Sequence, residues 1–226
     1  MVIMKMEKIK KVKILRNRGL NMVNKKMGYF GKRIIDITLS SIGLILLSPV
    51  LLIVGILIRL KLGSPIFFTQ DRVGKENKVF KIIKFRTMKD VRDVNGNLIP
   101  ESERRTSFGN KLRDLSIDEI PELINILKGD MSLVGPRPLL VDYLQYYNDE
   151  QIKRHNVLPG LTGWAQINGR NSITWEEKFK LDLWYVNNYS LKLDIKILFM
   201  TIYKVLKRDG INQGIEVTME RFNGMN

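Results

Sequence analysis

Apolar residues are concentrated in one uninterrupted run near the start of the chain. Ile37 to Ile58 spans 22 residues without a charged side chain. As a helix, the run is long enough to cross the roughly 30 Å hydrocarbon core of a bilayer. Ser48-Pro49 lies near its midpoint, and a proline inside a helix removes a backbone donor, which costs about 3 kcal/mol. The run therefore predicts a membrane helix with a break at its centre.

The basic residues that flank this run do not favour one orientation across a membrane. The 20 residues before it contain five Lys or Arg residues, and the 20 residues after it also contain five. A helix that crosses the bilayer usually concentrates these residues on its cytoplasmic side. A re-entrant helix broken at Ser48-Pro49 keeps both flanks on anionic lipid, with the Ser48 hydroxyl as a candidate donor for the carbonyls freed by Pro49. A kinked helix that crosses the bilayer and a buried core helix are the alternatives.

Beyond the run, the pattern of apolar positions predicts one α+β domain that is mostly helical. Two apolar segments, 66–70 and 79–85, flank Gly74–Asn77 and predict a small β-hairpin. The polar stretch 90–110 predicts a long loop with a turn at Asn95-Gly96. Four helices are expected, at 116–128 (closed by Gly129), 139–147, 175–188 and 191–207.

The last predicted helix carries an apolar stripe that consists of Leu191, Ile195, Leu198, Phe199 and Ile202. A stripe of this kind usually faces a protein core. In a protein that is already held at a membrane, it also suits an amphipathic helix lying in the interface.

Composition favours a membrane partner over a nucleic acid. The 226 residues carry a net charge of +15, and residues 1–33 contribute +10 of it through eleven basic side chains against Glu7. Basic patches bind phosphate of either kind, and the adjacent apolar run favours lipid. Residues 1–27 suit a basic surface helix or a disordered arm, and translation that starts at Met27 is a third interpretation.

The residue types also exclude several kinds of site. The chain has no cysteine, so it has no disulfide framework and no thiolate metal site. His155 is the single histidine and cannot build a multi-histidine metal site, so a structural role is expected for it. Acid–base chemistry is therefore expected from carboxylates.

The segment Ser116-Ile117-Asp118-Glu119-Ile120-Pro121 is the sharpest local signal for chemistry. Ser116 and Glu119 have the spacing of a capping box, and Pro121 lies where a missing donor is tolerated best. Asp118 would then lie at the positive end of a helix dipole, which favours an ionised carboxylate. Such an Asp can act as a nucleophile or a metal ligand; a plain N-terminal capping pair is the alternative.

Three arginines add a preference for phosphate. Arg137 lies between two prolines, Arg170 ends a glycine-rich loop, and Arg113 lies about one turn before the Asp-Glu pair. Guanidinium groups bind phosphate oxygens in a bidentate manner. Each arginine alone suits a surface charge, but their presence with carboxylates on a membrane chain indicates phosphoryl transfer.

Four motifs in order resemble a known family over about residues 28–226. They are Lys84-Phe85-Arg86-Thr87-Met88, Leu115–Leu123, Leu127–Pro138 and Pro159–Gln166. The chain resembles the bacterial sugar transferases, which are monotopic phosphoglycosyl transferases acting on polyprenyl phosphate. Its closest likeness is to the small type represented by undecaprenyl-phosphate bacillosamine 1-phosphate transferase. The resemblance also covers the Ser48-Pro49 break, but not residues 1–27.

This resemblance implies a complete reaction. Members move a sugar 1-phosphate from a UDP-sugar to undecaprenyl phosphate on the cytoplasmic face of the inner membrane and release UMP, as a first step of N-glycan, capsule or exopolysaccharide assembly. It implies Asp118 as the nucleophile that forms a covalent phosphosugar intermediate and as a ligand of Mg²⁺. Glu119 would be a metal partner or an acid–base group, and Arg113, Arg137 and Arg170 would contact phosphate.

The resulting hypothesis has three parts along the chain. We expect a basic extension at 1–27, a re-entrant membrane helix at 28–62 and a cytosolic catalytic domain at 63–226 that adds interfacial amphipathic helices. The identity of the sugar is left open. Two rivals from other classes are a bitopic, non-catalytic membrane adaptor and a nucleic-acid-binding protein tethered by its basic arm.

Overall fold

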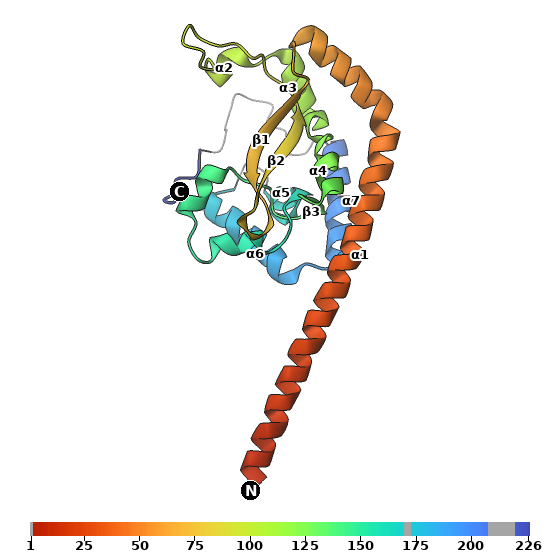
Figure 1. Ribbon diagram of the computed structural model, residues 1–226, viewed down its shortest axis with the longest axis vertical. Coiled ribbons are helices and arrows are strands. Elements are labelled where there is room, and N and C mark those ends of the chain that lie inside the picture. The colour runs from red at the N-terminus through yellow and green to blue at the C-terminus, as the bar shows by residue number, and fades with distance from the viewer. Residues whose placement is uncertain (1, 170–172, 208–219) are drawn as a thin grey trace. The chain divides into compact units, whose positions relative to one another are not determined.

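The computed structural model describes residues 2–169, 173–207 and 220–226, without the side chains of residues 2–29 and 206. The chain divides into two units, Met1–Ile35 and Asp36–Asn226. The first unit is helical where it is described, and the rest of this account concerns the second. The elements, shown in Figure 1, are α1 (Val2–Lys61), β1 (Phe67–Val73), η1 (Lys75–Asn77), β2 (Val79–Phe85), α2 (Glu101–Arg104), α3 (Ser107–Asp114), η2 (Ile117–Glu119), α4 (Glu122–Lys128), β3 (Ser132–Val134), η3 (Val141–Tyr146), η4 (Gln151–Asn156), β4 (Gly160–Thr162), α5 (Trp164–Asn168), α6 (Trp175–Asn188) and α7 (Leu191–Lys207).

Helix α1 continues through Ser48-Pro49, and it curves there rather than ending (Figure 1). The Ser48 hydroxyl donates to the carbonyl oxygen of Ile45 at 2.8 Å. Ile45 lies four residues before Pro49, so its carbonyl is the one that the proline leaves without an amide donor. The predicted role of Ser48 is confirmed. The structure shows no break in the helix at this point, and a re-entrant path stays a prediction.

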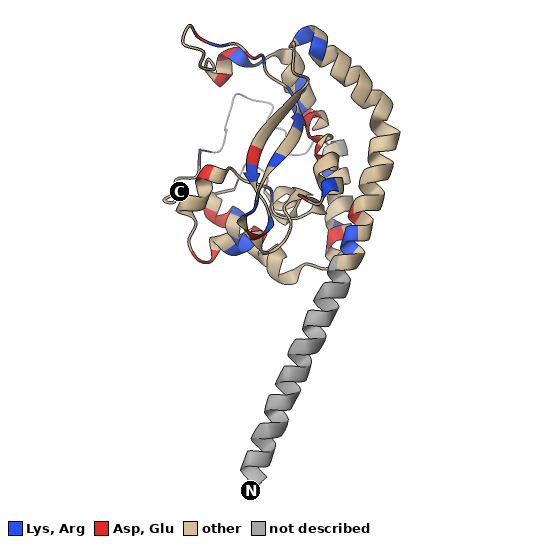
Figure 2. Cartoon of the chain, in the orientation of Figure 1, with Lys and Arg blue, Asp and Glu red and all other residues tan. Residues whose placement is uncertain are grey.

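Part of α1 has the composition of a membrane segment. Among the described residues, one helix is long and apolar enough to cross a membrane, Phe30–Lys61, with a mean hydropathy of 2.8. Figure 2 shows the segment of α1 before Arg59 and Lys61 as a long uncharged arc. Several of its large apolar side chains are exposed, namely Ile45, Leu46, Leu52, Ile53 and Leu60. This exposed apolar surface indicates association with a membrane.

The α+β fold is confirmed, and the predicted hairpin forms between β1 and β2. The two strands pair antiparallel from Phe67 opposite Phe85 to Val73 opposite Val79. Their connection contains η1, where Glu76 and Asn77 have positive φ angles of 56° and 60°. Asn125 of α4 then fixes the helix to this hairpin, because its side chain accepts from Ile83 N at 3.0 Å and donates to Lys81 O at 2.8 Å. Helix α4 therefore packs directly against β2.

The main core lies between β2, α4, the β3–β4 pair and the last helices. Its buried members are Ile82, Leu123, Ile126, Met131, Leu133, Val134, Ile167, Tyr185 and Ile197. Strands β3 and β4 pair in parallel, Ser132 with Gly160 and Val134 with Thr162. Asp36, near the middle of α1, accepts from Leu133 N at 2.9 Å, and this hydrogen bond joins the helix to β3.

The predicted bounds of α6 and α7 are confirmed, but the face of α7 that packs on the core is not the predicted one. Ile197 is fully buried, whereas Ile195, Phe199 and Ile202 are exposed, Phe199 to 69%. The core interpretation of the stripe is therefore wrong for these three residues. Their exposure is compatible with the interfacial alternative.

Backbones approach one another closely where β4 meets the loop after β3. A Cβ atom added at Gly135 would lie 2.3 Å from Leu158 O, and one added at Gly160 would lie 2.0 Å from Gly135 N. A Cβ added at Gly163 would lie 2.1 Å from Gly135 O. Only glycine permits this contact, and Arg137 follows Gly135 by two residues.

Candidate active site

The turn that carries Asp118 is not the helix start that its sequence predicts. Ser116 has a positive φ of 54° and makes no side-chain cap, and Ile117–Glu119 form the 3₁₀ turn η2. Helix α4 begins only at Glu122, after Pro121. The predicted capping box and the single helix 116–128 are therefore wrong, although Gly129 closes α4 in the left-handed conformation as expected. Asp118 lies on a turn between α3 and α4.

The Asp118 carboxylate is half-buried, and none of the described residues donates a hydrogen bond to it. Burial raises the pKa of Asp118 to about 6, and the negative charge of Glu119 acts in the same direction. Lys84, Arg137 and Arg113 oppose this shift through their positive charges. The prediction that its surroundings favour the ionised form is thus wrong. At neutral pH the carboxylate is still mostly ionised, and its oxygens are available to a ligand.

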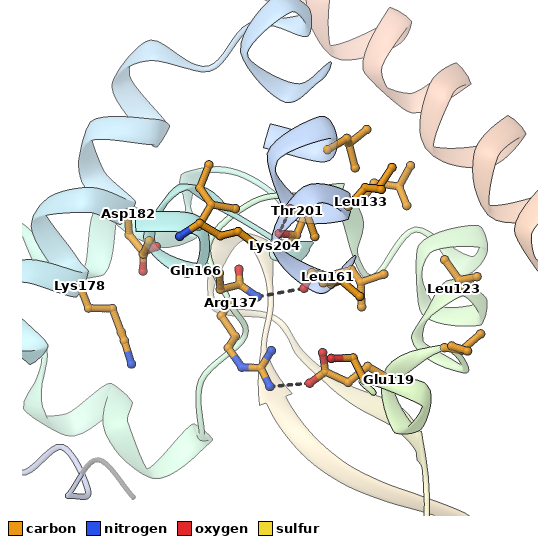
Figure 3. A pocket seen from close by; sticks show the side chains of 18 of the residues that line it. Glu119, Leu123, Leu133, Arg137, Leu161, Gln166, Lys178, Asp182, Thr201 and Lys204 are labelled. Atoms are coloured by element: carbon orange, nitrogen blue, oxygen red, sulfur yellow. Dashed lines mark hydrogen bonds and ion pairs between the residues drawn. The ribbon is translucent and has the colours of Figure 1, made fainter. Parts of the chain in front are cut away.

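Glu119 has the opposite surroundings. Its Oε1 atom accepts from Lys84 Nζ and from an Arg137 guanidinium nitrogen, both at 2.6 Å (Figure 3). Burial alone would raise the pKa of Glu119, but the charges of Arg137 and Lys84 outweigh it and hold the pKa well below the usual range. The two neighbouring carboxylates therefore differ: Glu119 binds two cations directly, whereas Asp118 has no direct partner among the described residues.

Lys84 and Glu122 belong to this cluster, and the reasoning from sequence missed both as site residues. Lys84 Nζ lies 3.0 Å from Glu122 Oε1, and burial followed by the charge of Glu119 raises the pKa of Glu122. Lys84 shares the strand face of the buried Ile82, because strand residues two apart point the same way. A lysine on a buried strand face requires an acidic partner, and that signal was present in the sequence.

The structure brings Arg137 to the Asp-Glu pair and leaves Arg113 at its edge. Arg113 Nε donates to Thr87 Oγ1 at 2.9 Å, and its guanidinium lies 3.7 Å from Glu101 Oε1. It acts on Asp118 through its charge rather than through a direct contact. Arg170 lies outside the described residues.

Glu119 and Arg137 line a cavity of about 590 Å³. Ser116 and Ile120 of the same turn also line it, whereas Asp118 is not among its lining residues. Figure 3 shows Lys178 and Asp182 on one side of this cavity, Arg137 near its centre, and Glu119 with Leu123 and Leu133 on the other side. The polar members are Glu119, Arg137, Gln166, Lys178, Asp182, Thr201 and Lys204. Such a mixture of cationic and apolar walls suits an anionic ligand with an apolar or aromatic part.

A second, buried ion pair supports the Arg137 loop. The Arg154 guanidinium donates to Asp182 Oδ2 at 2.7 and 3.1 Å and to the Arg137 carbonyl oxygen at 2.8 Å. His155, next to it, makes a 2.6 Å hydrogen bond with Asn77 Oδ1. Burial and the charge of Arg154 lower the pKa of His155 to about 3. These contacts indicate a structural role for the histidine, as expected.

The described residues contain no group of three or more His, Cys, Asp or Glu side chains that could hold a metal ion. Mg²⁺ in phosphate-transfer sites often uses only one or two carboxylates and completes its shell with substrate phosphates and water. Asp118 is compatible with such a site, since none of the described residues donates to its carboxylate, whereas Glu119 is occupied by two cations.

Comparison with known proteins assigns the family. The family model described as bacterial sugar transferase matches residues 27–208. The chain is 55% identical over 193 residues to the uncharacterized sugar transferase EpsL of Bacillus subtilis, with 85% of this chain and 96% of that protein covered.

Two longer relatives have more specific names. The UDP-glucose:undecaprenyl-phosphate glucose-1-phosphate transferase of Escherichia coli is 40% identical over 76% of this chain and 39% of its own length. The UDP-N-acetylgalactosamine-undecaprenyl-phosphate N-acetylgalactosaminephosphotransferase of Aeromonas hydrophila is 40% identical over 78% of this chain and 44% of its own length. This chain thus spans about two fifths of each of these two relatives. With the family model and the relatives in agreement, the chain belongs to the bacterial sugar transferase family and is an enzyme of the transferase class.

Proposed function

We propose that this enzyme transfers a sugar 1-phosphate from a UDP-sugar to undecaprenyl phosphate and releases UMP, with a covalent phosphosugar intermediate on Asp118. One observation carries the mechanism. Asp118, which has no direct partner among the described residues, adjoins Glu119, which two cations hold at the edge of a cavity suited to an anionic ligand. The names of the longer relatives support the two substrates.

The reaction balances in two displacements at one phosphorus atom. In the first, an Asp118 oxygen attacks the phosphorus that bears the sugar, the bond from that phosphorus to the UMP oxygen breaks, and UMP leaves with the electron pair. In the second, an oxygen of the lipid phosphate attacks the same phosphorus and breaks its bond to Asp118. The products are a lipid diphosphate sugar and the free carboxylate. The covalent intermediate lets a water-soluble and a lipid substrate use one site in turn.

The cations around Asp118 offset the repulsion between a carboxylate and an anionic donor. Arg137 and Lys84 supply guanidinium and ammonium donors for phosphate oxygens, and Arg113 adds its charge from the edge. Glu119 stays ionised because of its two partners, so it orients Lys84 and Arg137 rather than exchanging protons. The roles predicted for Glu119 are thereby reduced to one, since Glu119 is proposed as a positioning residue and not as an acid–base group.

Mg²⁺ is proposed as the cofactor, with Asp118 as the protein ligand. When bound, the ion neutralises phosphate charge and stabilises the charge that develops during transfer. We expect chelation of divalent ions to abolish UMP release from the wild-type enzyme and added Mg²⁺ to restore it. Unchanged UMP release in the presence of a chelator would contradict this part of the proposal.

The catalytic domain is proposed to lie on the cytoplasmic face of the membrane, where UDP-sugars are made. The equal basic flanks of the apolar run support a helix whose two ends meet anionic lipid on one side. An N-terminal cysteine tag should then be protected from a membrane-impermeant label in intact cells. Labelling from outside would support the crossing helix instead.

The sugar is not assigned, and the named relatives use two different donors, one with glucose and one with N-acetylgalactosamine. The direct test is UMP release screened across UDP-sugars, with and without undecaprenyl phosphate. The correct donor, labelled in its sugar, should also leave a labelled enzyme when the lipid is omitted.

Matched variants test the role of Asp118. Asp118→Asn should abolish both the label and UMP release, because an amide cannot form the acyl phosphate. Asp114→Asn removes an exposed carboxylate four residues away and should retain both. Turnover of Asp118→Asn at the wild-type rate would remove Asp118 from the proposed role.

A further inference from the structure

A second cavity, of about 510 Å³, lies between α1, the base of the β-hairpin and the start of α4. We name it the apolar groove. Its lining contains one charged side chain, Arg59, and the rest is almost entirely hydrocarbon. The lining residues are Leu44, Leu51, Leu52, Gly55, Ile56, Arg59, Leu60, Ile66, Phe67, Phe85, Pro121 and Ile124.

The turn and helix that carry the candidate site separate this groove from the first cavity. Ile120 and Leu123 line the first cavity, whereas their neighbours Pro121 and Ile124 line the groove. Helix α1 also borders both spaces, because Leu47 lines the first cavity while Leu44 and Leu51 line the groove. The segment after Asp118 is therefore a wall with the cavity of charged and apolar lining on one side and the apolar groove on the other.

The groove opens on the part of the chain that is suited to lipid. Leu52, Ile56 and Leu60 form part of its lining and are exposed, and they belong to the apolar helix segment Phe30–Lys61. Its inner surface is firmly packed, with Gly55 buried and Phe67 stacked on Phe85 at a centroid distance of 5.4 Å. A chain of hydrocarbon can enter from the membrane side without displacing a polar group.

The segment of α1 that carries Arg59 packs against the turn that carries Asp118. Ile117, which precedes Asp118, packs against the buried cluster that contains Val54 and Ile58. Arg59 follows Ile58 at the end of the helix, where it is exposed. A ligand with a long apolar tail and one anionic head therefore finds both of its complements here, hydrocarbon along α1 and the guanidinium of Arg59 in the groove lining.

We propose that the apolar groove binds the isoprenoid units nearest the phosphate of the acceptor lipid, and that Arg59 attracts this phosphate as the lipid approaches the turn that carries Asp118. This inference rests on the proposed function and adds the location of the acceptor. The rest of the isoprenoid chain stays in the bilayer. An acyl chain of an ordinary phospholipid would fill the groove without bringing a reactive phosphate to the turn, and the test separates the two.

The first test narrows the groove without touching the candidate catalytic residues. A Cβ atom at Gly55 would lie 3.7 Å from an Ile66 methyl carbon, which is ordinary van der Waals contact, and Gly55→Val adds two methyl groups beyond this Cβ to narrow the groove. The KM for undecaprenyl phosphate should rise about tenfold, which is ~1.4 kcal/mol of binding. Single-turnover UMP release without lipid should be unchanged, which also shows that the variant is folded.

Control variants make this result specific. Ile53→Phe adds bulk at an exposed position of the same helix that lines neither cavity, and it should leave the KM for the lipid unchanged. Arg59→Gln should raise that KM, and Arg59→Lys should retain most of the wild-type value. A KM for the lipid that stays at the wild-type value in both Gly55→Val and Arg59→Gln would overturn the proposal.

The second test does not require turnover. A short isoprenoid phosphate that carries a benzophenone should crosslink in detergent micelles to residues of the groove, and undecaprenyl phosphate should prevent this. Protection by added phospholipid alone would make the groove a phospholipid site and overturn the proposal, as would crosslinks confined to other surfaces. Failure of the proposed function would instead be seen as absent UMP release with every donor, while the crosslinking result would still identify the ligand of the groove.

Discussion

Two of the arginine–carboxylate pairs among the described residues differ in their access to a ligand. Arg137 and Glu119 meet at 2.6 Å, with 42% and 20% of their side chains exposed. Arg154 and Asp182 meet at 2.7 Å, with 1% and 3% exposed. The two pairs are joined, because Arg154 also donates to the Arg137 carbonyl oxygen.

The comparison separates a guanidinium group that is open to a ligand, that of Arg137, from one with a structural role, that of Arg154. The Arg137 guanidinium lines the cavity and keeps donors available for an anion, so its partner Glu119 fixes its direction without hiding it. The Arg154 guanidinium makes its hydrogen bonds to Asp182 and to backbone, and it is enclosed. Similar chemistry therefore supports the reaction at one pair and the position of the loop at the other.

The largest effect is expected from breaking the buried pair. Asp182→Asn leaves the Arg154 guanidinium buried without a counter-charge, and such a change typically costs about 3–5 kcal/mol of stability. Thermal unfolding of the purified enzyme should show the loss. The double variant Arg154→Met/Asp182→Leu should recover a large part of it, because it removes both charges. Equal unfolding temperatures for Asp182→Asn and the wild-type enzyme would contradict the assigned role.

The exposed pair, Arg137 and Glu119, should show the opposite result, with a large effect on turnover and a small effect on stability. Arg137→Gln removes a donor that faces the cavity, and loss of one such donor in a charge-stabilising site typically lowers kcat by about 10²–10³-fold. Stability should change little, because the side chain is only half-buried. UMP release and thermal unfolding measured on the same preparation separate the two effects. A large loss of stability with near-normal turnover would reverse the comparison between the pairs.

The pH dependence sharpens the contrast between Asp118 and Glu119. Asp118, as the proposed nucleophile, must be ionised to react, and its pKa is raised to about 6. Single-turnover UMP release should therefore fall about tenfold per pH unit below that value and level off above it. Arg113→Gln removes a positive charge that lowers this pKa, so it should move the midpoint upward. A midpoint near pH 4 in the wild-type enzyme would contradict the burial of Asp118 in the folded state.

The smallest expected effect is a gain in the stability of the folded protein when Asp118 is replaced by Asn. The folded pKa of Asp118, about 6, lies above the unfolded value of about 3.9, so ionisation disfavours the folded state. The cost is absent below about pH 4, grows up to pH 6 and is complete above it. Asp118→Asn should therefore be more stable than the wild-type enzyme at pH 7.5 by about 1–2 kcal/mol, with no difference at pH 4. Thermal unfolding at both values checks this, and lower stability at pH 7.5 would contradict it.

The fold could be predicted where local patterns decided it. The hairpin and the helices 175–188 and 191–207 follow from apolar spacing and turn residues, and the structure confirms them. Helix α3 was not predicted, because it lies within a polar stretch and buries little besides Gly109 and Leu112. The buried face of α7 also could not be read from spacing, because a membrane and a core select the same residue types.

The site was predicted in part, and one repeated pattern shows why. A hydroxyl residue with Glu three positions later occurs at both Ser116 and Thr174. Thr174 forms a full capping box with Glu177 at the start of α6. At Ser116 the corresponding carboxylate, Glu119, is bound instead by Lys84 and Arg137, which come from distant segments. A local pattern cannot show that its carboxylate has stronger partners elsewhere, so the sequence selected Asp118, Glu119 and Arg137 as candidates, while the predicted cap was wrong and Lys84 was not predicted.

The contact among Gly135, Gly160 and Gly163 has a consequence for any survey of tolerated substitutions. Each added methyl group would meet backbone at 2.3 Å or less, and the loop that presents Arg137 would have to move. Saturation mutagenesis should therefore score these glycines as intolerant as Asp118, although none of them carries a functional group. A growth assay would therefore score structural residues and proposed catalytic residues alike. Stability and turnover measured on purified variants would distinguish the two kinds.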